Sequence, residues 1–160
     1  HLIYEKTQKN ITELGLSVSR EIPSKSISVV CIGSTIGKVS MTTQLCASNQ
    51  QINSLIPFDI ELSDFLYYSS HQFLVHQLFI EAGLQAVPIV NKSTFDTLNI
   101  LLPNDKQEAK GIATRLITID NKIEKEKVSL SKHQQLKAGL MQDLLRGKVD
   151  VNVADEILKN

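Results

Sequence analysis

The sequence predicts an α+β protein, with a mixed domain of short strands and helices over residues 1–103, a long α-helix over 104–147 and a tail over 148–160. Two periodicities lead to this division. Short apolar runs separated by glycine and polar residues fill the first 103 residues, whereas a heptad repeat follows Pro103. Because 42% of the residues are hydrophobic, the chain can build a folded core.

Three short strands are predicted between residues 27 and 56. β-branched and apolar residues gather there in runs broken by glycines or polar residues, a pattern typical of strands joined by turns. Gly33 and Gly37 separate the first two runs, and the polar stretch Ser48–Gln51 precedes the third. The predicted strands are Ile27–Ile32, Val39–Thr43 and Ile52–Ile56.

A helix is predicted after these strands, from Ser63 as its N-cap to about Ile80, with Gly83 near its end. Apolar residues at helical spacing indicate much of the face that it buries. They are Leu62, Leu66, Phe73 and Ile80. Two further apolar runs predict strands at Ala86–Val90 and Leu98–Leu102. The first 103 residues therefore form a mixed domain.

The long helix is predicted from its caps and from the absence of helix breakers. Asn104 or Asp105 can cap its start, and no proline follows Pro103. Gly147 is placed to end it. About 40 helical residues at 1.5 Å rise give a rod of roughly 60 Å.

A heptad seam runs along this helix, and seven of its ten positions are apolar. The apolar positions are Ile112, Leu116, Ile119, Ile123, Leu130, Leu140 and Leu144, and the polar ones are Glu126, His133 and Lys137. Such a seam indicates a coiled coil, so the helix needs a partner helix from a second copy, the other half of the full protein or a different subunit. The alternative is a helical hairpin near Lys125–Lys127, where no glycine, proline or asparagine provides a turn signal.

Composition excludes several classes of protein. Cys31 and Cys46 stand among apolar or small residues and are interpreted as buried free thiols. The four histidines form no metal-ligand pattern. No apolar stretch approaches the roughly 18 residues of a membrane span, and no secretory signal opens the chain, so a cytoplasmic protein is expected. The net charge is zero. Charge therefore gives no support for nucleic-acid binding.

No catalytic site is predicted. The segment from Gly33 to Val39 resembles a phosphate-binding loop, but it is one residue short between its glycines and has Val39 at the magnesium-binding position. A glycine-mediated turn between strands is the better interpretation. An acidic–acidic–lysine group like that of many nucleases occurs at Asp105, Glu108 and Lys110. These residues fall within one helical turn and are therefore interpreted as the solvated first turn of the helix.

Planar polar side chains suggest a different activity. Asn49, Gln50 and Gln51 follow a strand, Gln85 lies beside a glycine, and Lys38 follows the glycine turn. Asn and Gln suit bidentate hydrogen bonds to adenine, whereas Lys suits guanine or phosphate. Polar runs at strand ends are more often turns, so these residues alone do not decide the function.

Seven segments of the chain follow one another in an order that suggests a known family. They are Thr7–Ser19, Gly33–Val39, Asn49–Ile52, Phe65–Tyr68, Gly83–Gln85, Leu102–Ala113 and Leu136–Val149. In this order they resemble segments of the type I restriction–modification specificity subunits, and the last of them is the most specific. The chain departs from the family at Ala109, where Gln is common, and at Asp150, where Arg is common. The tryptophan-containing start of the family's domain is absent, so His1 is expected to begin a fragment or a truncated product.

The resemblance implies a non-catalytic specificity subunit that binds double-stranded DNA. Residues 1–103 would be a target-recognition domain for one half of a bipartite site, and 104–147 the conserved spacer helix. The helix would pair with a second copy or the subunit's other half and dock methyltransferase subunits, which carry S-adenosylmethionine; a restriction subunit completes the complex. The chain itself would hold no cofactor or metal.

Seven residues are expected to face DNA under this interpretation: Lys9, Arg20, Lys25, Lys38, Gln50, Gln51 and Lys92. Thr35, Ile36 and the two neighbouring glycines would shape the turn. For Gln50 and Gln51 a scaffold role is preferred over a DNA contact. The alternative function is a coiled-coil interaction scaffold that does not read DNA sequence.

Overall fold

The computed structural model describes residues 3–4, 10–83 and 87–150. They fall into two compact units, His1–Ile117 and Thr118–Asn160, called here the N-terminal and C-terminal units. A small sheet and several helices, including a long C-terminal helix, make the chain α+β, as predicted. No helix among the described residues is long and apolar enough to cross a membrane.

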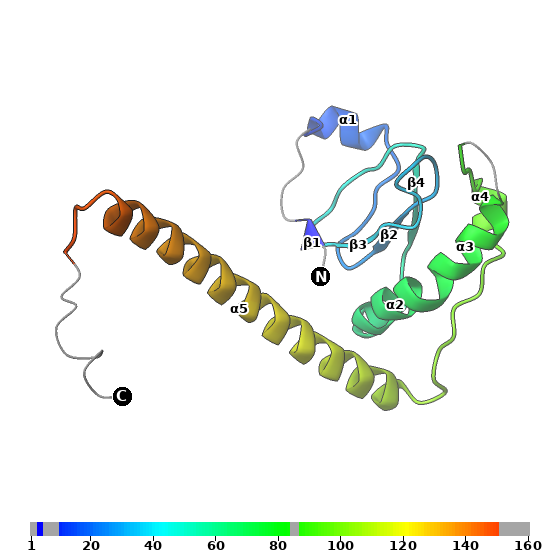
Figure 1. Ribbon diagram of the computed structural model, residues 1–160. Helices are drawn as coiled ribbons and strands as arrows, with labels where there is room; N and C mark the ends of the chain where they lie inside the picture. The colour runs from blue at the N-terminus through cyan, green and yellow to red at the C-terminus, as the bar shows by residue number, and fades with distance from the viewer. Residues whose placement is uncertain (1–2, 5–9, 84–86, 151–160) are drawn as a thin grey trace. The chain divides into compact units, whose positions relative to one another are not determined.

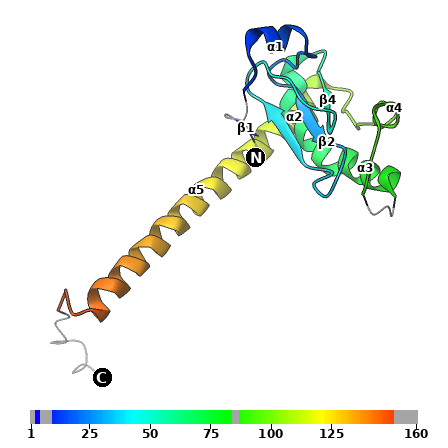
Figure 2. The same cartoon turned by 90° about the horizontal axis from the view of Figure 1, so that it is seen from above.

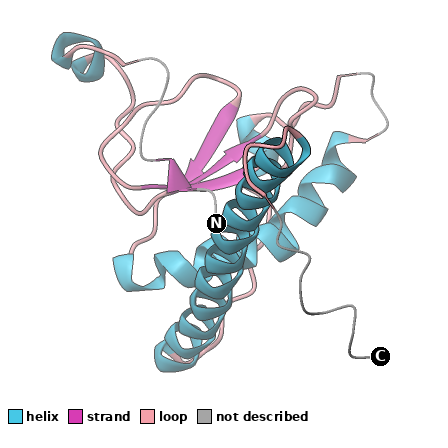
Figure 3. Cartoon of the chain, turned by 60° about the vertical axis from the view of Figure 1, so that its left-hand side comes forward, coloured by secondary structure: helices cyan, strands magenta, loops and turns pink. Residues whose placement is uncertain are grey.

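A four-stranded sheet forms the centre of the N-terminal unit (Figure 1 and Figure 3). Its strands are β1 (Ile3–Tyr4), β2 (Ile27–Val30), β3 (Val39–Thr42) and β4 (Ile52–Leu55). The strand order is β1-β3-β2-β4; β2 is antiparallel to β3 and β4, and β1 is parallel to β3. The three predicted strands in this region are confirmed, each slightly shorter than expected.

Alternation gives the sheet an apolar face and a more polar face. Ile27, Val29, Val39 and Met41 are buried, whereas the residues between them along β2 and β3 are half-buried. Because successive side chains of a strand point to opposite sides, the four buried residues share one face. They belong to the core cluster, together with Tyr67, Leu74 and Leu78 of the helical layer.

A continuous helical segment packs on the apolar face, as Figure 1 and Figure 2 show. It consists of a 3₁₀ turn η1 (Ile60–Leu62), α2 (Ser63–Ser69), a π-helical turn η2 (Ser70–Leu74) and α3 (Val75–Ala82). Gly83 ends it, as predicted. The predicted N-cap is wrong, because the Asp59 side chain accepts from the Glu61 backbone N–H at 3.0 Å, while the Ser63 hydroxyl is buried.

The predicted buried face of this helix is also partly wrong. Phe73 and Ile80 are 41% and 64% exposed. The buried residues are Ser63, Tyr67, Ser69, Ser70, Leu74, Leu78 and Ala82. The prediction followed the largest aliphatic and aromatic side chains, whereas the buried side includes serines and an alanine, which are small enough for close packing.

The two strands predicted after the helix do not form. Ile89 makes only an isolated bridge with Ile32, and residues 84–86 lie outside the described residues. In Leu98–Leu102, side chains of the helical layer take the backbone groups that a strand partner would need. Gln77 bonds both the N–H and the C=O of Asn99, at 3.0 and 2.6 Å, and Ser69 Oγ donates to the Leu101 carbonyl.

Two short helices also belong to the N-terminal unit. Helix α1 (Glu13–Ser17) begins at Thr12, whose hydroxyl accepts from the Gly15 N–H at 3.1 Å. Helix α4 (Lys92–Phe95) begins at Asn91 and buries Phe95.

Helix α5 runs without interruption over Lys106–Leu145. The Asp105 carboxylate caps its start by accepting from the Gln107 N–H at 2.8 Å, as predicted. At its end Gly147 adopts a φ of 66°, and Lys148 N–H donates to the Asp143 carbonyl, so the predicted glycine cap is present. The hairpin alternative near Lys125–Lys127 is wrong.

The predicted seam of α5 is only partly covered. Ile112 is half-buried in the N-terminal unit, where Ala109 and Ala113 are the buried residues of the helix. The six later apolar seam residues, from Leu116 to Leu144, are between 38% and 59% exposed. In the C-terminal unit, the described residues bury no hydrophobic side chain.

Candidate nucleic-acid interface

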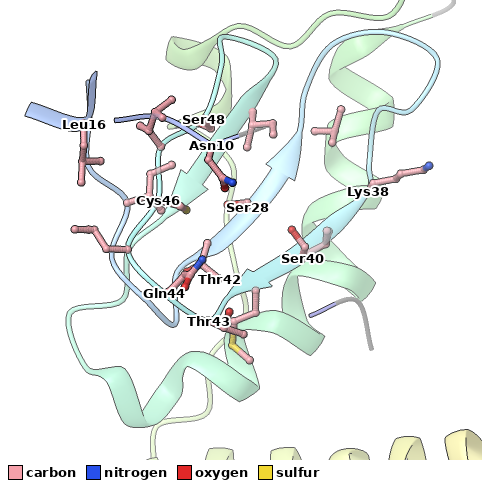
Figure 4. Close-up of a pocket in the computed structure, with 18 of the residues that line it drawn as sticks. Asn10, Leu16, Ser28, Lys38, Ser40, Thr42, Thr43, Gln44, Cys46 and Ser48 are labelled. Carbon is pink, nitrogen blue, oxygen red and sulfur yellow. The ribbon is translucent and has the colours of Figure 1, made fainter. Parts of the chain in front are cut away.

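The polar face of the sheet lines a groove of about 680 Å³, called here the sheet groove (Figure 4). Its other walls are the segment Asn10–Leu16, which includes the start of α1, and the loop Thr43–Ser48. All of its lining residues lie in the N-terminal unit. A concave surface with a few polar groups is the usual form of a binding site.

The floor of the sheet groove follows directly from strand register. Ser28 of β2 lies opposite Ser40 of β3 and Ser54 of β4. The Ser28 and Ser54 hydroxyl oxygens are 3.0 Å apart and share a hydrogen bond. Two residues further along β2, Val30 lies opposite Ile52 and adds apolar surface to the floor. The floor therefore combines hydroxyl groups with aliphatic side chains.

Backbone pairing holds one wall of the groove in place. Ile22 and Cys46 exchange two backbone hydrogen bonds of 2.8 and 2.9 Å, which tie the loop to the segment before β2. The Thr42 hydroxyl donates to the Pro23 carbonyl at 2.7 Å and fixes the same segment from the sheet. Gln44 is exposed on this loop and labelled in Figure 4. The wall is thus a loop that is held by hydrogen bonds and that presents polar side chains to the groove.

Lys38 is the predicted DNA-facing residue that lines this groove. It follows the turn between β2 and β3, in which Gly33 and Gly37 adopt φ values of 91° and 84°. Val30 and the turn exchange hydrogen bonds, from Gly37 N–H to the Val30 carbonyl and from Val30 N–H to the Lys38 carbonyl, both 2.9 Å. The segment is therefore a glycine turn between strands, as predicted. Lys38 is exposed, and no described carboxylate pairs with it.

The other predicted cationic residues lie in different surroundings. Lys25 is 3.3 Å from Asp64, and Lys92 is 2.8 Å from Asp96, the C-cap residue of its helix. Arg20 is exposed between α1 and β2. None of these three lines the sheet groove. Lys9 lies outside the described residues.

Gln50 and Gln51 form the turn that leads into β4, and both side chains are exposed. The Asn49 side chain shapes this turn by accepting from the Gln51 N–H at 3.1 Å. The Gln51 carbonyl accepts from the Cys31 N–H at 2.7 Å. The Gln51 backbone thus helps to hold the turn in place, while the side chains of both residues are exposed.

Several polar residues of the groove were missed by sequence reasoning. They are Asn10, Thr12, Ser28, Ser40, Gln44 and Ser48. The alternation of serine with valine in Ile27–Val30 and Val39–Thr42 could have indicated the floor. The wall residues gave no such signal, because they reach the groove only through the pairing of distant segments.

The groove has no strong charge of its own. Its charged lining residues are Lys38 and Glu13. Hydroxyl and amide groups provide the rest of its polar surface, and such groups bond both phosphate oxygens and the edges of bases. Among the described residues, no group of three His, Cys, Asp or Glu side chains could hold a metal ion.

The free cysteines are structural. Cys31 is buried, Cys46 is half-buried, and neither forms a disulfide. Burial raises the pKa of both thiols, which favours the protonated, unreactive form. The prediction of buried free thiols is confirmed for Cys31, whereas Cys46 is a free thiol that is only half-buried.

Comparison with known proteins identifies the class of this chain. Residues 4–132 match the family described as the type I restriction modification DNA specificity domain, and the chain belongs to that family. A curated relative is the type I restriction enzyme HindI specificity subunit of Haemophilus influenzae, which is 32% identical over 152 residues. That alignment covers 90% of this chain and 32% of the relative. The chain thus spans about a third of the relative's length.

Proposed function

We propose that this chain recognises one half of a bipartite duplex DNA site on behalf of a type I restriction–modification complex. The observation that carries the proposal is the family match over residues 4–132. The sheet groove supports it, because hydroxyl, amide and ammonium groups there can bond phosphates and base edges. The chain contributes recognition in the cytoplasm, while methyltransferase subunits bind S-adenosylmethionine and a restriction subunit cleaves DNA.

Within this function, Lys38 is the strongest candidate for a DNA contact. It is exposed, lines the groove and has no described carboxylate partner. Arg20, Gln50 and Gln51 are further candidates, because their side chains are exposed. Of the remaining predicted contacts, Lys25 and Lys92 would have to leave Asp64 and Asp96, and Lys9 rests on the sequence alone.

The long helix would give the complex its architecture. The exposed apolar seam of α5 supports pairing with a second copy or with the other half of the complete subunit. Methyltransferase subunits would dock on the paired helices. A reader of two half-sites needs such a spacer, because successive half-sites on one face of a duplex are about 34 Å apart.

Lys38→Ala tests the proposed contact. If the ammonium neutralises a phosphate, the substitution weakens binding to all duplexes alike, and the slope of log affinity against log salt becomes shallower by about one unit. Fluorescence anisotropy with a labelled duplex at several salt concentrations measures both quantities. Lys127→Ala is the matched control, because Lys127 is an exposed lysine of the C-terminal unit.

The same titration separates the two candidate functions. A DNA reader loses affinity steeply as salt rises, through release of counterions. An interaction scaffold would not bind the duplex at any salt concentration. An unchanged affinity and salt slope in Lys38→Ala would remove this residue from the interface.

A further inference from the structure

The first turns of α5 are held to the loop before α2 by a group of ion pairs. The Lys106 ammonium contacts the carboxylates of both Asp59 and Glu61. Lys110, one turn further along the helix, is 3.0 Å from the other oxygen of Glu61. Glu61 therefore bridges two lysines on one face of α5. We call these four residues, together with Ala109 and Ala113, the clamp.

The acidic side of the clamp stands on an ordered turn. Asp59 caps η1 through one carboxylate oxygen, which accepts from the Glu61 N–H, and uses the other for Lys106. The Leu62 N–H donates to the Asp59 carbonyl at 3.1 Å and closes the same turn. Both carboxylates are thus placed by backbone structure, which reduces the conformational entropy lost in forming the ion pairs.

The pKa values of the clamp agree with its geometry. The hydrogen bond from Lys106 lowers the pKa of the Asp59 carboxyl, and hydrogen bonds from Lys106 and Lys110 lower that of Glu61. The same two carboxylates raise the pKa of Lys106. Because the carboxyl pKa values are depressed, the ion pairs are intact at neutral pH and are lost as the pH falls through those depressed values.

Packing adds a second constraint that is independent of charge. Ala109 is 0% exposed and Ala113 is 4% exposed, and residues four apart lie on the same face of a helix. Because alanine has a short side chain, this buried pair brings the helix backbone close to the residues that cover it. A single ion pair would allow the helix to change its tilt, but a buried face combined with three ion pairs opposes such a change.

The start of α5 determines more than its own position. All clamp residues belong to the N-terminal unit, and the helix continues without a break to Leu145. A tilt of about 5° at the start moves the far end of a roughly 60 Å helix by about 5 Å. This displacement exceeds the spacing of about 3.4 Å between successive base pairs. A spacer helix can therefore fix the separation between half-sites only if its first turns are held in place.

We propose that the clamp fixes the direction of the spacer helix, and that Glu61 is its central positioning residue for the separation between two half-sites. The inference rests on the proposed function. It assigns a specificity role to residues that do not line the sheet groove, because they would set the number of base pairs between half-sites rather than the bases that are read.

Pulsed electron paramagnetic resonance on the full chain tests the clamp without DNA. Spin labels at S93C and S131C, both exposed positions, report the distance between the N-terminal unit and the middle of α5 in a Cys46→Ser background. The chain with an intact clamp is expected to give a single narrow distance distribution. Glu61→Lys places a cation against Lys106 and Lys110 and is expected to broaden or shift it.

Two further variants make the result specific. Glu124→Lys reverses a carboxylate near Lys127 in the middle of α5 and is expected to leave the distribution unchanged. Glu61→Lys combined with Lys110→Glu restores one attractive pair and is expected to narrow the distribution again. A Glu61→Lys distribution equal to that of Glu124→Lys, or a double variant as broad as Glu61→Lys, would overturn the proposal. Circular dichroism verifies that each variant retains its helix content.

A methylome distinguishes failure of the clamp from failure of DNA recognition. In the complete gene, Glu61→Lys should add methylation at motif copies whose half-sites are one base pair closer or further apart. Methylation confined to the original separation would contradict the clamp while leaving DNA recognition intact. If DNA recognition itself is wrong, no bipartite motif depends on the gene, whereas the resonance result is unaffected.

Discussion

Gly37→Ala is expected to destabilise the N-terminal unit by about 2–5 kcal/mol. Two costs add at this position. A φ of 84° lies in the left-handed region, which costs a residue with a Cβ roughly 1–2 kcal/mol. A Cβ there would also lie 3.0 Å from Phe79 Cε2 and 3.1 Å from Val75 Cγ1, so α3 or the turn must shift, at about 1–3 kcal/mol. Urea unfolding followed by circular dichroism measures the loss.

Gly33→Ala is the matched control for this prediction. Gly33 has a similar φ of 91° in the same turn, but nothing lies within 4 Å of an added Cβ. Gly33→Ala should therefore cost only the backbone term of roughly 1–2 kcal/mol. Equal losses in the two variants would show that the turn does not pack against α3 as described. Because the turn leads into Lys38, the comparison also tests how firmly that residue is positioned.

Leu130→Asp is expected to abolish pairing of the long helices. In the proposed pair of helices, a seam leucine that is 59% exposed in a single chain would become buried, and a carboxylate there would lose its hydration. A penalty of at least about 3 kcal/mol weakens the association more than roughly 100-fold. Analytical ultracentrifugation over a range of concentrations measures the association of the chain.

Val128→Asp controls for the added charge. Val128 is 48% exposed and lies two residues from the nearest seam positions, on the opposite side of the helix. The Val128→Asp substitution should therefore leave the association of the chain unchanged. Pairing with a second copy would be excluded if the unsubstituted chain sedimented as a monomer, or if Leu130→Asp formed the same oligomer as the unsubstituted chain.

The elements that the sequence predicted correctly depend on local patterns. The strands of Ile27–Leu55 follow from alternation between glycine turns, and the ends of α5 follow from Asp105 and Gly147, whose side-chain and backbone preferences act within one turn. The error over Leu98–Leu102 has the opposite origin. The Gln77 side chain bonds the backbone of Asn99, which is 22 residues away, and no local sequence pattern indicates such a partner.

The candidate site was predicted less completely than the fold for the same reason. Lys38 was found because it follows a recognisable glycine turn, but the groove beside it is assembled from segments that lie far apart in the sequence. Lys110 illustrates the limit most clearly. It was interpreted as part of a solvated first turn with Glu108, whereas its ammonium bonds Glu61, 49 residues away. Tertiary folding alone brings these charges together.

Under the proposed function, this chain directs methylation to one bipartite DNA site. Comparison of the methylomes of the wild-type host and of a strain lacking the complete gene tests it most directly. N6-methyladenine is expected to disappear from one bipartite motif in the deletion strain and to return when the gene is restored. If the wild-type host methylates a bipartite motif and the deletion leaves its methylation unchanged, the chain does not specify that site, and the claim is contradicted.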